Sequence, residues 1–179
     1  MARGVILFII IGIFSVFQLS VFPNFFPVAV IPDAVLVMVL LWSVRLDYEN
    51  VWKRALLAGI LVDLLMFHFL GVEALSFLII SFSISYITKR ILVAHSLWKF
   101  AIIPLLILGA VMINDLILTI FSYESLEIFQ QSFLSQKIFF NWPFLQRFFY
   151  DLILGALIYW PLKKLEEKMD NLSQIKFSN

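Results

Sequence analysis

Five carboxylates stand inside or at the edge of long apolar stretches of this chain, and they are its first candidates for chemistry. They are Asp33, Asp63, Glu73, Asp115 and Asp151. A carboxylate in hydrocarbon costs roughly 2.5–3.5 kcal/mol on insertion scales, so it normally faces the interior of a helix bundle and finds partners there. The candidate partners are Arg147, Asn114, His68, Gln18 and Asn141. Arg147 and Asp151 are four residues apart, a spacing at which helical side chains meet, and we expect this pair before any other.

These acids have two open interpretations. In the first they form a structural polar core that fixes which helices pack together. In the second they line a path for protons or cations. The apolar stretches contain no Lys, no second Arg and no series of acids that continues to the other face of the membrane. This pattern disfavours a pump, and we favour the structural interpretation.

Catalytic and metal-binding patterns are missing from the sequence. The chain has no Cys, which excludes disulfides, thiolate metal sites and cysteine nucleophiles. Neither His68 nor His95 has an acid three or four residues further on, and no H-E-x-x-H, Walker A or G-x-S-x-G motif occurs. We therefore predict a protein that is not an enzyme, holds no metal or cofactor and binds no nucleic acid.

The composition requires a membrane. The chain is 63% hydrophobic and only 14% charged, with 20 Phe among 179 residues, whereas soluble domains carry about 25% charged residues. A helix needs about 20 apolar residues to cross the hydrocarbon layer. Six segments fit, some of them marginally: Gly4–Phe22, Val28–Val44, Ala55–Leu70, Val72–Thr88, Phe100–Phe121 and Leu145–Trp160. The predicted fold class is an all-α polytopic membrane protein with six transmembrane helices.

The basic residues predict the orientation of these helices. Eleven of the thirteen Lys and Arg residues fall at the N-terminus, in the second and fourth connections or in the C-terminal tail, and only Lys137 and Arg147 fall on the other side. By the positive-inside rule, both termini are cytoplasmic. We expect the bacterial cytoplasmic (inner) membrane, with a transmembrane domain at residues 1–162 and a short cytoplasmic tail at 163–179.

Two flanking segments are predicted to be amphipathic. In the tail, apolar residues at helical spacing indicate either a solvated continuation of the last helix, which we favour, or a contact with a cytoplasmic partner. Apolar residues in the connection Ser122–Phe144 also recur at helical intervals, which is typical of a helix lying in the membrane interface. That helix is either a surface anchor or a docking element.

Glycine and proline mark where helices meet and where one begins. Gly71 predicts a tight turn between the third and fourth segments, while Gly59, Gly109 and Gly155 predict close helix approach. Counted from Pro32, the second helix is too short to span the membrane. Either it begins earlier and kinks, or the chain descends in irregular form, Pro32 occupies the first helical turn and Asp33 caps it. Asp63 is expected near the middle of its helix and the other four acids in the outer half.

The order of these features resembles a known family. Pro32-Asp33 opens the second segment, Gly59 and Asp63 follow in "AGILVD", Gly71 and Ala74 mark the turn, and Lys89-Arg90 close the fourth segment. This order resembles MreD, the rod-shape-determining membrane protein of bacteria. The resemblance is specific over about residues 30–90 and architectural elsewhere.

The resemblance implies a non-enzymatic scaffold of the cell-elongation machinery, required for rod shape and lateral peptidoglycan synthesis. It implies that the protein binds the bitopic MreC and links it to MreB filaments, to the polymerase RodA and to its partner transpeptidase. The family fold is similar to the S-components of energy-coupling-factor transporters, which supplies the alternative of a vitamin-binding S-component. The residues expected to serve structure or partner docking are Pro32, Asp33, Gly59, Asp63, Gly71, Glu73, Asp115, Arg147 and Asp151.

Overall fold

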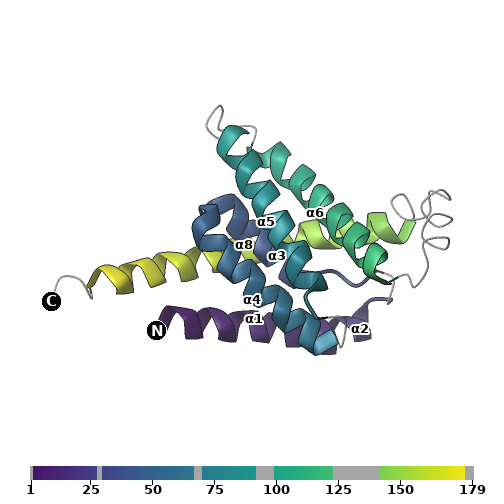
Figure 1. The fold of residues 1–179 in the computed structure, drawn as a ribbon, viewed down its shortest axis with the longest axis horizontal. Coiled ribbons are helices and arrows are strands. Elements are labelled where there is room, and N and C mark those ends of the chain that lie inside the picture. The colour runs from purple at the N-terminus through teal and green to yellow at the C-terminus, as the bar shows by residue number, and fades with distance from the viewer. Residues whose placement is uncertain (1, 28–29, 67–69, 92–98, 123–141, 176–179) are drawn as a thin grey trace.

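The structure is a computed structural model that describes residues 2–27, 30–66, 70–91, 99–122 and 142–175. Within these ranges the regular elements are all helices, which confirms the predicted all-helical class (Figure 1). A short helix, α2 (Phe22–Phe25), follows the first long one. The long helices are α1 (Ala2–Ser20), α3 (Ala34–Arg45), α4 (Tyr48–Met66), α5 (Val72–Ile91), α6 (Lys99–Ser122) and α8 (Trp142–Ile175).

Each long helix overlaps one of the six predicted segments. Three stretches in the described residues are long and apolar enough to cross a membrane: Ile6–Phe25, Val72–Arg90 and Ile102–Phe121. By contrast, α3 has 12 residues and is about 18 Å long at 1.5 Å per residue. The predicted interface helix within Ser122–Phe144 lies almost wholly outside the described residues.

Helix α3 is the centre of the bundle. Every residue from Ala34 to Ser43 is buried, and α3 contacts each of the other long helices. A helix that is apolar on all sides can be surrounded by other helices without burying charged groups, which suits this central position. The remaining helices form a shell around α3, and their outward faces carry large apolar side chains.

Helices α4 and α5 form a tight antiparallel hairpin, as predicted. They share the most extensive contact between any two described helices. The chain reverses at Gly71, whose φ of +102° lies in the region that favours glycine. The hairpin therefore depends on this one residue for its turn.

Helix α8 continues without a break through the predicted domain boundary at residue 162. It has 34 residues, with Pro161 inside it, and is about 51 Å long at 1.5 Å per residue. This length exceeds the roughly 30 Å of a hydrocarbon core. The start of α1 and the end of α8 lie on the left of Figure 1, whereas the end of α6 and the start of α8 lie on the right.

Candidate functional site

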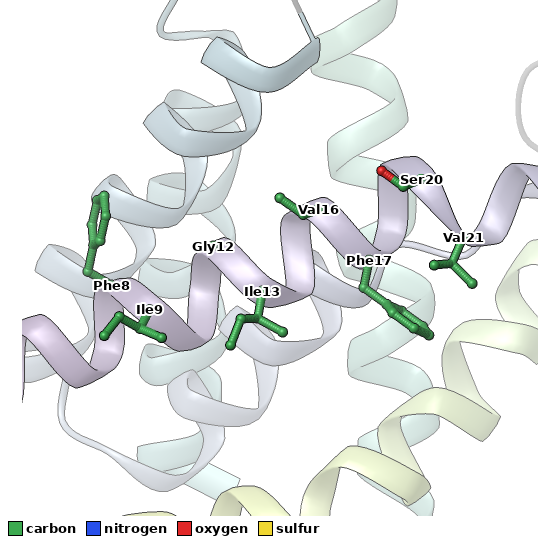
Figure 2. Close-up of a pocket in the computed structure, with 8 residues that line it drawn as sticks. All are labelled: Phe8, Ile9, Gly12, Ile13, Val16, Phe17, Ser20 and Val21. Carbon is green, nitrogen blue, oxygen red and sulfur yellow. The ribbon is translucent and has the colours of Figure 1, made fainter.

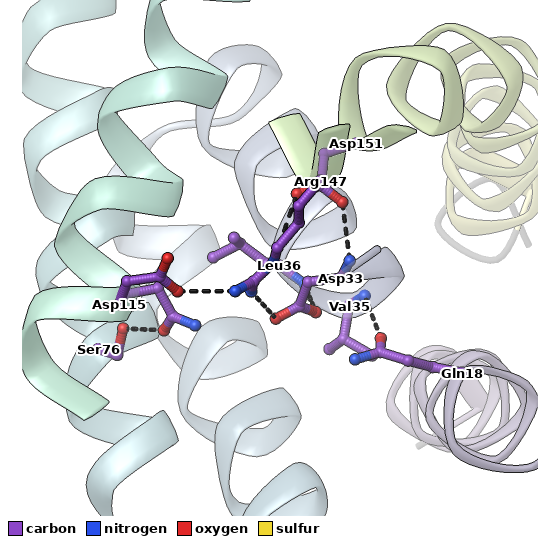
Figure 3. Close-up of polar contacts among 9 residues, drawn as sticks. Gln18, Asp33, Val35, Leu36, Ser76, Asp115, Arg147 and Asp151 are labelled. Carbon is purple, nitrogen blue, oxygen red and sulfur yellow. Dashed lines mark hydrogen bonds and ion pairs between the residues drawn. The ribbon is translucent and has the colours of Figure 1, made fainter. Parts of the chain in front are cut away.

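The buried N-terminus of α3 is closed by side chains from three helices or their caps. The first N–H groups of a helix lack partners within it, and a buried one must find them elsewhere. Asp33 is the N-cap, and its Oδ1 accepts a hydrogen bond from Leu36 N at 2.9 Å. Gln18 Oε1, from α1, accepts from Val35 N at 3.1 Å. Asp151 Oδ1, from α8, accepts from Asp33 N at 2.7 Å (Figure 3).

This geometry decides between the two predictions made for Pro32 and Asp33. The helix begins at Ala34, after three residues without regular secondary structure, and Asp33 caps it as expected. Pro32 precedes the helix, so its predicted place in the first helical turn is wrong. Gln18, expected to meet an acid, bonds to backbone instead.

Arg147 is the cation of this end of the bundle and joins three helices. Its Nη1 lies 2.7 Å from Asp115 Oδ1 on α6, and its Nη2 lies 3.8 Å from Asp33 Oδ2. Its Nε lies 4.0 Å from Asp151 Oδ2 within α8. The predicted Arg147–Asp151 pair is thus present at the limit of an ion pair, but Asp115 is the nearer partner. Because the side chain of Arg147 is only 19% exposed, these contacts form largely away from water.

A second polar contact extends this buried polar cluster, which we define as Gln18, Asp33, Asp115, Arg147 and Asp151, towards α5. Ser76 Oγ donates a hydrogen bond to Asn114 Oδ1 between α5 and α6 (Figure 3). Both residues are fully buried. Asn114 Nδ2 and Glu73 Oε2 are buried without a hydrogen-bond partner among the described residues. Burying such atoms is costly.

Asp63 holds the hairpin between α4 and α5. Its Oδ2 accepts from Gly71 N at 2.8 Å and from Ala74 N at 3.4 Å, and its Oδ1 accepts from Glu73 N at 3.0 Å. The side chain therefore caps the N-terminus of the next helix in the chain. Asp63 lies in the last turn of α4, so the prediction that it lies near mid-helix is wrong. The reason is that α4 begins at Tyr48, seven residues earlier than predicted.

Gly59 lies one turn before Asp63 and lets α5 approach α4. A Cβ at this position would overlap the Cα and N of Ala74. At Gly155 an added Cβ would make ordinary contacts of 3.5 Å with Ile107 and Val37. At Gly109 it would meet nothing within 4 Å, so the predicted close approach at Gly109 is wrong.

The structure therefore brings the predicted site residues into two adjoining groups. Asp33, Asp115, Arg147 and Asp151 meet around the start of α3, and Gly59, Asp63, Gly71 and Glu73 form the hairpin seam. His68 and Asn141, two of the expected partners of the acids, lie outside the described residues. The sequence did not predict the Ser76–Asn114 contact, because a Ser and an Asn on two apolar helices give no signal of facing each other.

The polar side chains of the site bond to the starts of helices and to one another across helices. Asp33, Asp63 and Asp151 each accept from backbone N–H groups at a helix start, and Arg147 ties α6 and α8 to that start. Such contacts fix the positions of α3, α5, α6 and α8 relative to one another. Contacts of this kind are what a structural polar core would make, and that interpretation of the acids stays a prediction.

An apolar groove runs along the outward face of α1. It has a volume of about 500 Å³ and is lined by α1 and the residue that follows it (Figure 2): Phe8, Ile9, Gly12, Ile13, Val16, Phe17, Ser20 and Val21. A Cβ added at Gly12 would meet nothing within 4 Å. The groove is therefore open at Gly12, where α1 carries no side chain.

The chain was compared with models of protein families. The model described as rod shape-determining protein MreD matches residues 1–169. The chain belongs to the MreD family. This confirms the resemblance inferred from the order of Pro32-Asp33, Gly59, Asp63 and Gly71.

Membership in the MreD family carries three statements. The family consists of integral membrane proteins with a role in rod-shape determination. It is part of the MreBCD shape-determining system. It is a structural membrane family and not a known enzyme family. Searches of curated proteins and of solved structures give no significant match.

Proposed function

We propose that this MreD-family protein is a non-enzymatic membrane scaffold of the cell-elongation machinery. In this role it binds MreC and links it to MreB, to the polymerase RodA and to its partner transpeptidase, in support of lateral peptidoglycan synthesis. The family match over residues 1–169 carries the proposal. The polar core supports it, because its side chains are engaged in holding helices together and give the bundle a fixed outer surface.

The proposed topology has six membrane-spanning helices with both termini in the cytoplasm. The tail at 163–179 then continues α8 out of the transmembrane domain at 1–162. The placement of basic residues supports this orientation, since Arg147 is the sole Lys or Arg beside the acids Asp33, Asp115 and Asp151 in the described part of the chain. The nine residues that we expect to serve structure or partner docking lie at the outer end in this topology, apart from Gly59.

The groove on α1 is the face that we propose for the single transmembrane helix of MreC. The α1 span is the least buried of the three membrane-spanning stretches, at 22% against 56% and 39%. Its groove is lined by apolar side chains apart from Ser20, which suits an apolar helix. Gly12 lets a second backbone approach closely, the arrangement by which transmembrane helices associate without a hydrophobic driving force.

Depletion and co-purification test the proposal together. Depletion should round rod-shaped cells, and detergent extracts should yield MreC with the tagged protein. Gly12→Leu should lower the MreC recovered, while Gly109→Leu, the same change at another open helical glycine, should not. Retention of rod shape on depletion together with absence of MreC from the pull-down would contradict the scaffold. Equal recovery with both variants would reject the α1 face alone and would indicate that lipid covers it.

A second candidate function is that of a small-molecule-binding S-component of a transporter. The buried atoms Glu73 Oε2 and Asn114 Nδ2, without partners among the described residues, favour it because a bound polar molecule would satisfy them. Such a protein should retain a small molecule through purification, detectable by native mass spectrometry, and should co-purify with ATPase subunits. Recovery of MreC without a retained small molecule and without ATPase subunits would favour the scaffold.

A further inference from the structure

Five basic side chains lie over aromatic rings in the described part of the chain. Lys53 Nζ is 5.4 Å from the centroid of Trp52, and Lys164 Nζ is 3.7 Å from that of Trp160. The guanidinium carbons of Arg45, Arg54 and Arg90 are 5.7, 5.2 and 4.7 Å from Tyr159, Trp42 and Tyr86. A cation over such a ring is attracted by the negative face of its π-system.

All five pairs lie at the end of the bundle opposite to the buried polar cluster. Arg45 is the last residue of α3, whose first turn is capped by Asp33. Arg90 is in the last turn of α5, whose start is capped by Asp63. Lys164 follows Asp151 on α8 by thirteen residues, or about 20 Å. We call this the basic–aromatic end and define it by the five basic residues and their five rings.

The two ends of the bundle differ in the groups that surround their basic side chains. Arg147 is matched by three carboxylates, which more than cancel its charge. An aromatic ring positions a cation and carries no net charge of its own. Among the side chains described at the basic–aromatic end and beside it, seven are basic and two, Asp47 and Glu49, are acidic, for a net charge of 7 − 2 = +5. Lys89 and Asp47 form an ion pair there, at 2.9 Å and exposed to solvent.

Three of the five rings stand at the edge of the apolar surface, whereas Trp42 is buried. Trp52, Tyr86 and Trp160 are 37%, 51% and 62% exposed and continue the outward apolar faces of α4, α5 and α8. Trp and Tyr concentrate where a membrane meets water, because their bodies are apolar and their tips polar. A ring at that level places its Lys or Arg beside the phosphates of the lipids.

We propose that the basic–aromatic end is a docking surface for the anionic headgroups of membrane phospholipids. The charge of +5 is complementary to a phosphate, and Lys and Arg both donate hydrogen bonds to phosphate oxygens. Lys53, Arg90 and Lys164, with their exposed rings, lie on α4, α5 and α8, so the surface contacts several lipids around the bundle. This inference is independent of the scaffold function and of the partners proposed for it.

The experiment uses the full chain in neutral detergent, to which phosphatidylglycerol or phosphatidylcholine is added. Bound lipids are counted by native mass spectrometry, and the unfolding temperature is measured alongside. Phosphatidylglycerol should be retained preferentially and should raise the unfolding temperature. The preference should shrink at high salt, because exposed charges are screened.

A triple variant, K53Q with R90Q and K164Q, removes three exposed charges and keeps the helices. Its apparent affinity for phosphatidylglycerol should fall roughly a hundredfold, since each basic residue near an anionic surface contributes about a factor of five. The control, K53R with R90K and K164R, keeps the charges and should bind as the parent does.

Two results would overturn the proposal. One is equal retention of the two lipids by the parent chain. The other is unchanged phosphatidylglycerol binding by the glutamine variant. If the glutamine variant fails to fold, the salt dependence of the parent decides in its place, and a salt-independent preference counts against the surface. A preference for an acidic protein over both lipids would assign the surface to that protein instead.

Discussion

Asp63 offers two oxygens to three backbone N–H groups, those of Gly71, Glu73 and Ala74. Each donor belongs to the turn or the first residues of α5, where a helix has no internal acceptors. A single side chain on one helix thus completes the start of the next. This use of a carboxylate explains why an acid is tolerated here: it accepts hydrogen bonds that the backbone would otherwise lack.

Replacing Asp63 with Ala should therefore destabilise the bundle. The buried N–H groups lose their acceptor, and we expect a cost of roughly 2–4 kcal/mol in the free energy of unfolding. Denaturation of the detergent-solubilised protein, followed by Trp fluorescence, measures it. Leu64→Ala is the matched control, because Leu64 is the next residue on α4 and is 54% exposed. Equal effects of the two changes would refute the capping role.

Arg147 provides a second prediction, on which partner it couples to most strongly. Asp115 is at 2.7 Å and Asp151 at 4.0 Å. Double-mutant cycles with Arg147→Gln should therefore give a larger coupling energy with Asp115→Asn, about 1–3 kcal/mol, than with Asp151→Asn. A larger coupling energy with Asp151→Asn would show instead that the spacing of four residues within α8 decides the pairing.

Asp151 should be sensitive to the loss of the oxygen that accepts from Asp33 N and tolerant of the loss of its charge. Asp151 Oδ1 accepts from Asp33 N, and Asn retains an oxygen for that bond. The stability of Asp151→Asn should thus be close to that of the parent. Asp151→Leu should lose roughly 1–3 kcal/mol in the free energy of unfolding, because a buried N–H is left without an acceptor. Thermal unfolding in detergent compares the two. A larger loss for Asn than for Leu would show that the charge matters most.

At the scale of elements, the contact of α4 with α5 rests on Gly59. A methyl group there would overlap the backbone of Ala74, which cannot yield as a flexible side chain does. We expect Gly59→Ala to cost roughly 2 kcal/mol or more, in line with overpacked cores. Gly109→Ala should instead be neutral or stabilise by up to about 1 kcal/mol, because Ala is the better helix former and nothing lies nearby.

Hydrogen exchange or thermal unfolding distinguishes these glycine variants. Faster exchange confined to α4 and α5 in Gly59→Ala would locate the damage in the hairpin. A Gly59→Ala protein as stable as the Gly109→Ala protein would show that α5 can move away from α4 at little cost.

The elements show what the sequence can predict. Apolar length predicted a helix in each of six places, and Gly71 predicted the turn, because both depend on local chemistry. The polar pairing depended on packing. Asp115 lies 32 residues from Arg147 in the chain, and helices that are apolar on all sides do not reveal which faces meet. The spacing rule therefore favoured Asp151, the neighbour within the same helix.

Charged residues also concealed the ends of helices. The predicted third segment excluded Tyr48 to Arg54 because they are polar and basic, yet α4 begins with them. The helix continues beyond the apolar layer, so Asp63 falls in its last turn. A pattern of hydrophobicity locates the part of a helix inside the membrane and leaves its full length open.

For the whole molecule, the orientation in the membrane can be tested with introduced cysteines, since the chain has none. Asn50 and Trp142 are exposed at opposite ends of the bundle. With both termini in the cytoplasm, a membrane-impermeant maleimide should label Trp142→Cys in intact spheroplasts. It should label Asn50→Cys only after permeabilisation. The reverse pattern would invert the topology.

The central position of α3 has a consequence for how the protein is made. Helices enter the membrane in the order of their synthesis, and α3 follows only α1 and α2. Yet the acceptor of Asp33 N is Asp151, 118 residues further along the chain. Val35 N and Leu36 N find their acceptors early, in Gln18 and Asp33, but Asp33 N waits until the ribosome has produced α8. Nascent chains cut short before α8 therefore keep one buried N–H at the start of α3 without an acceptor.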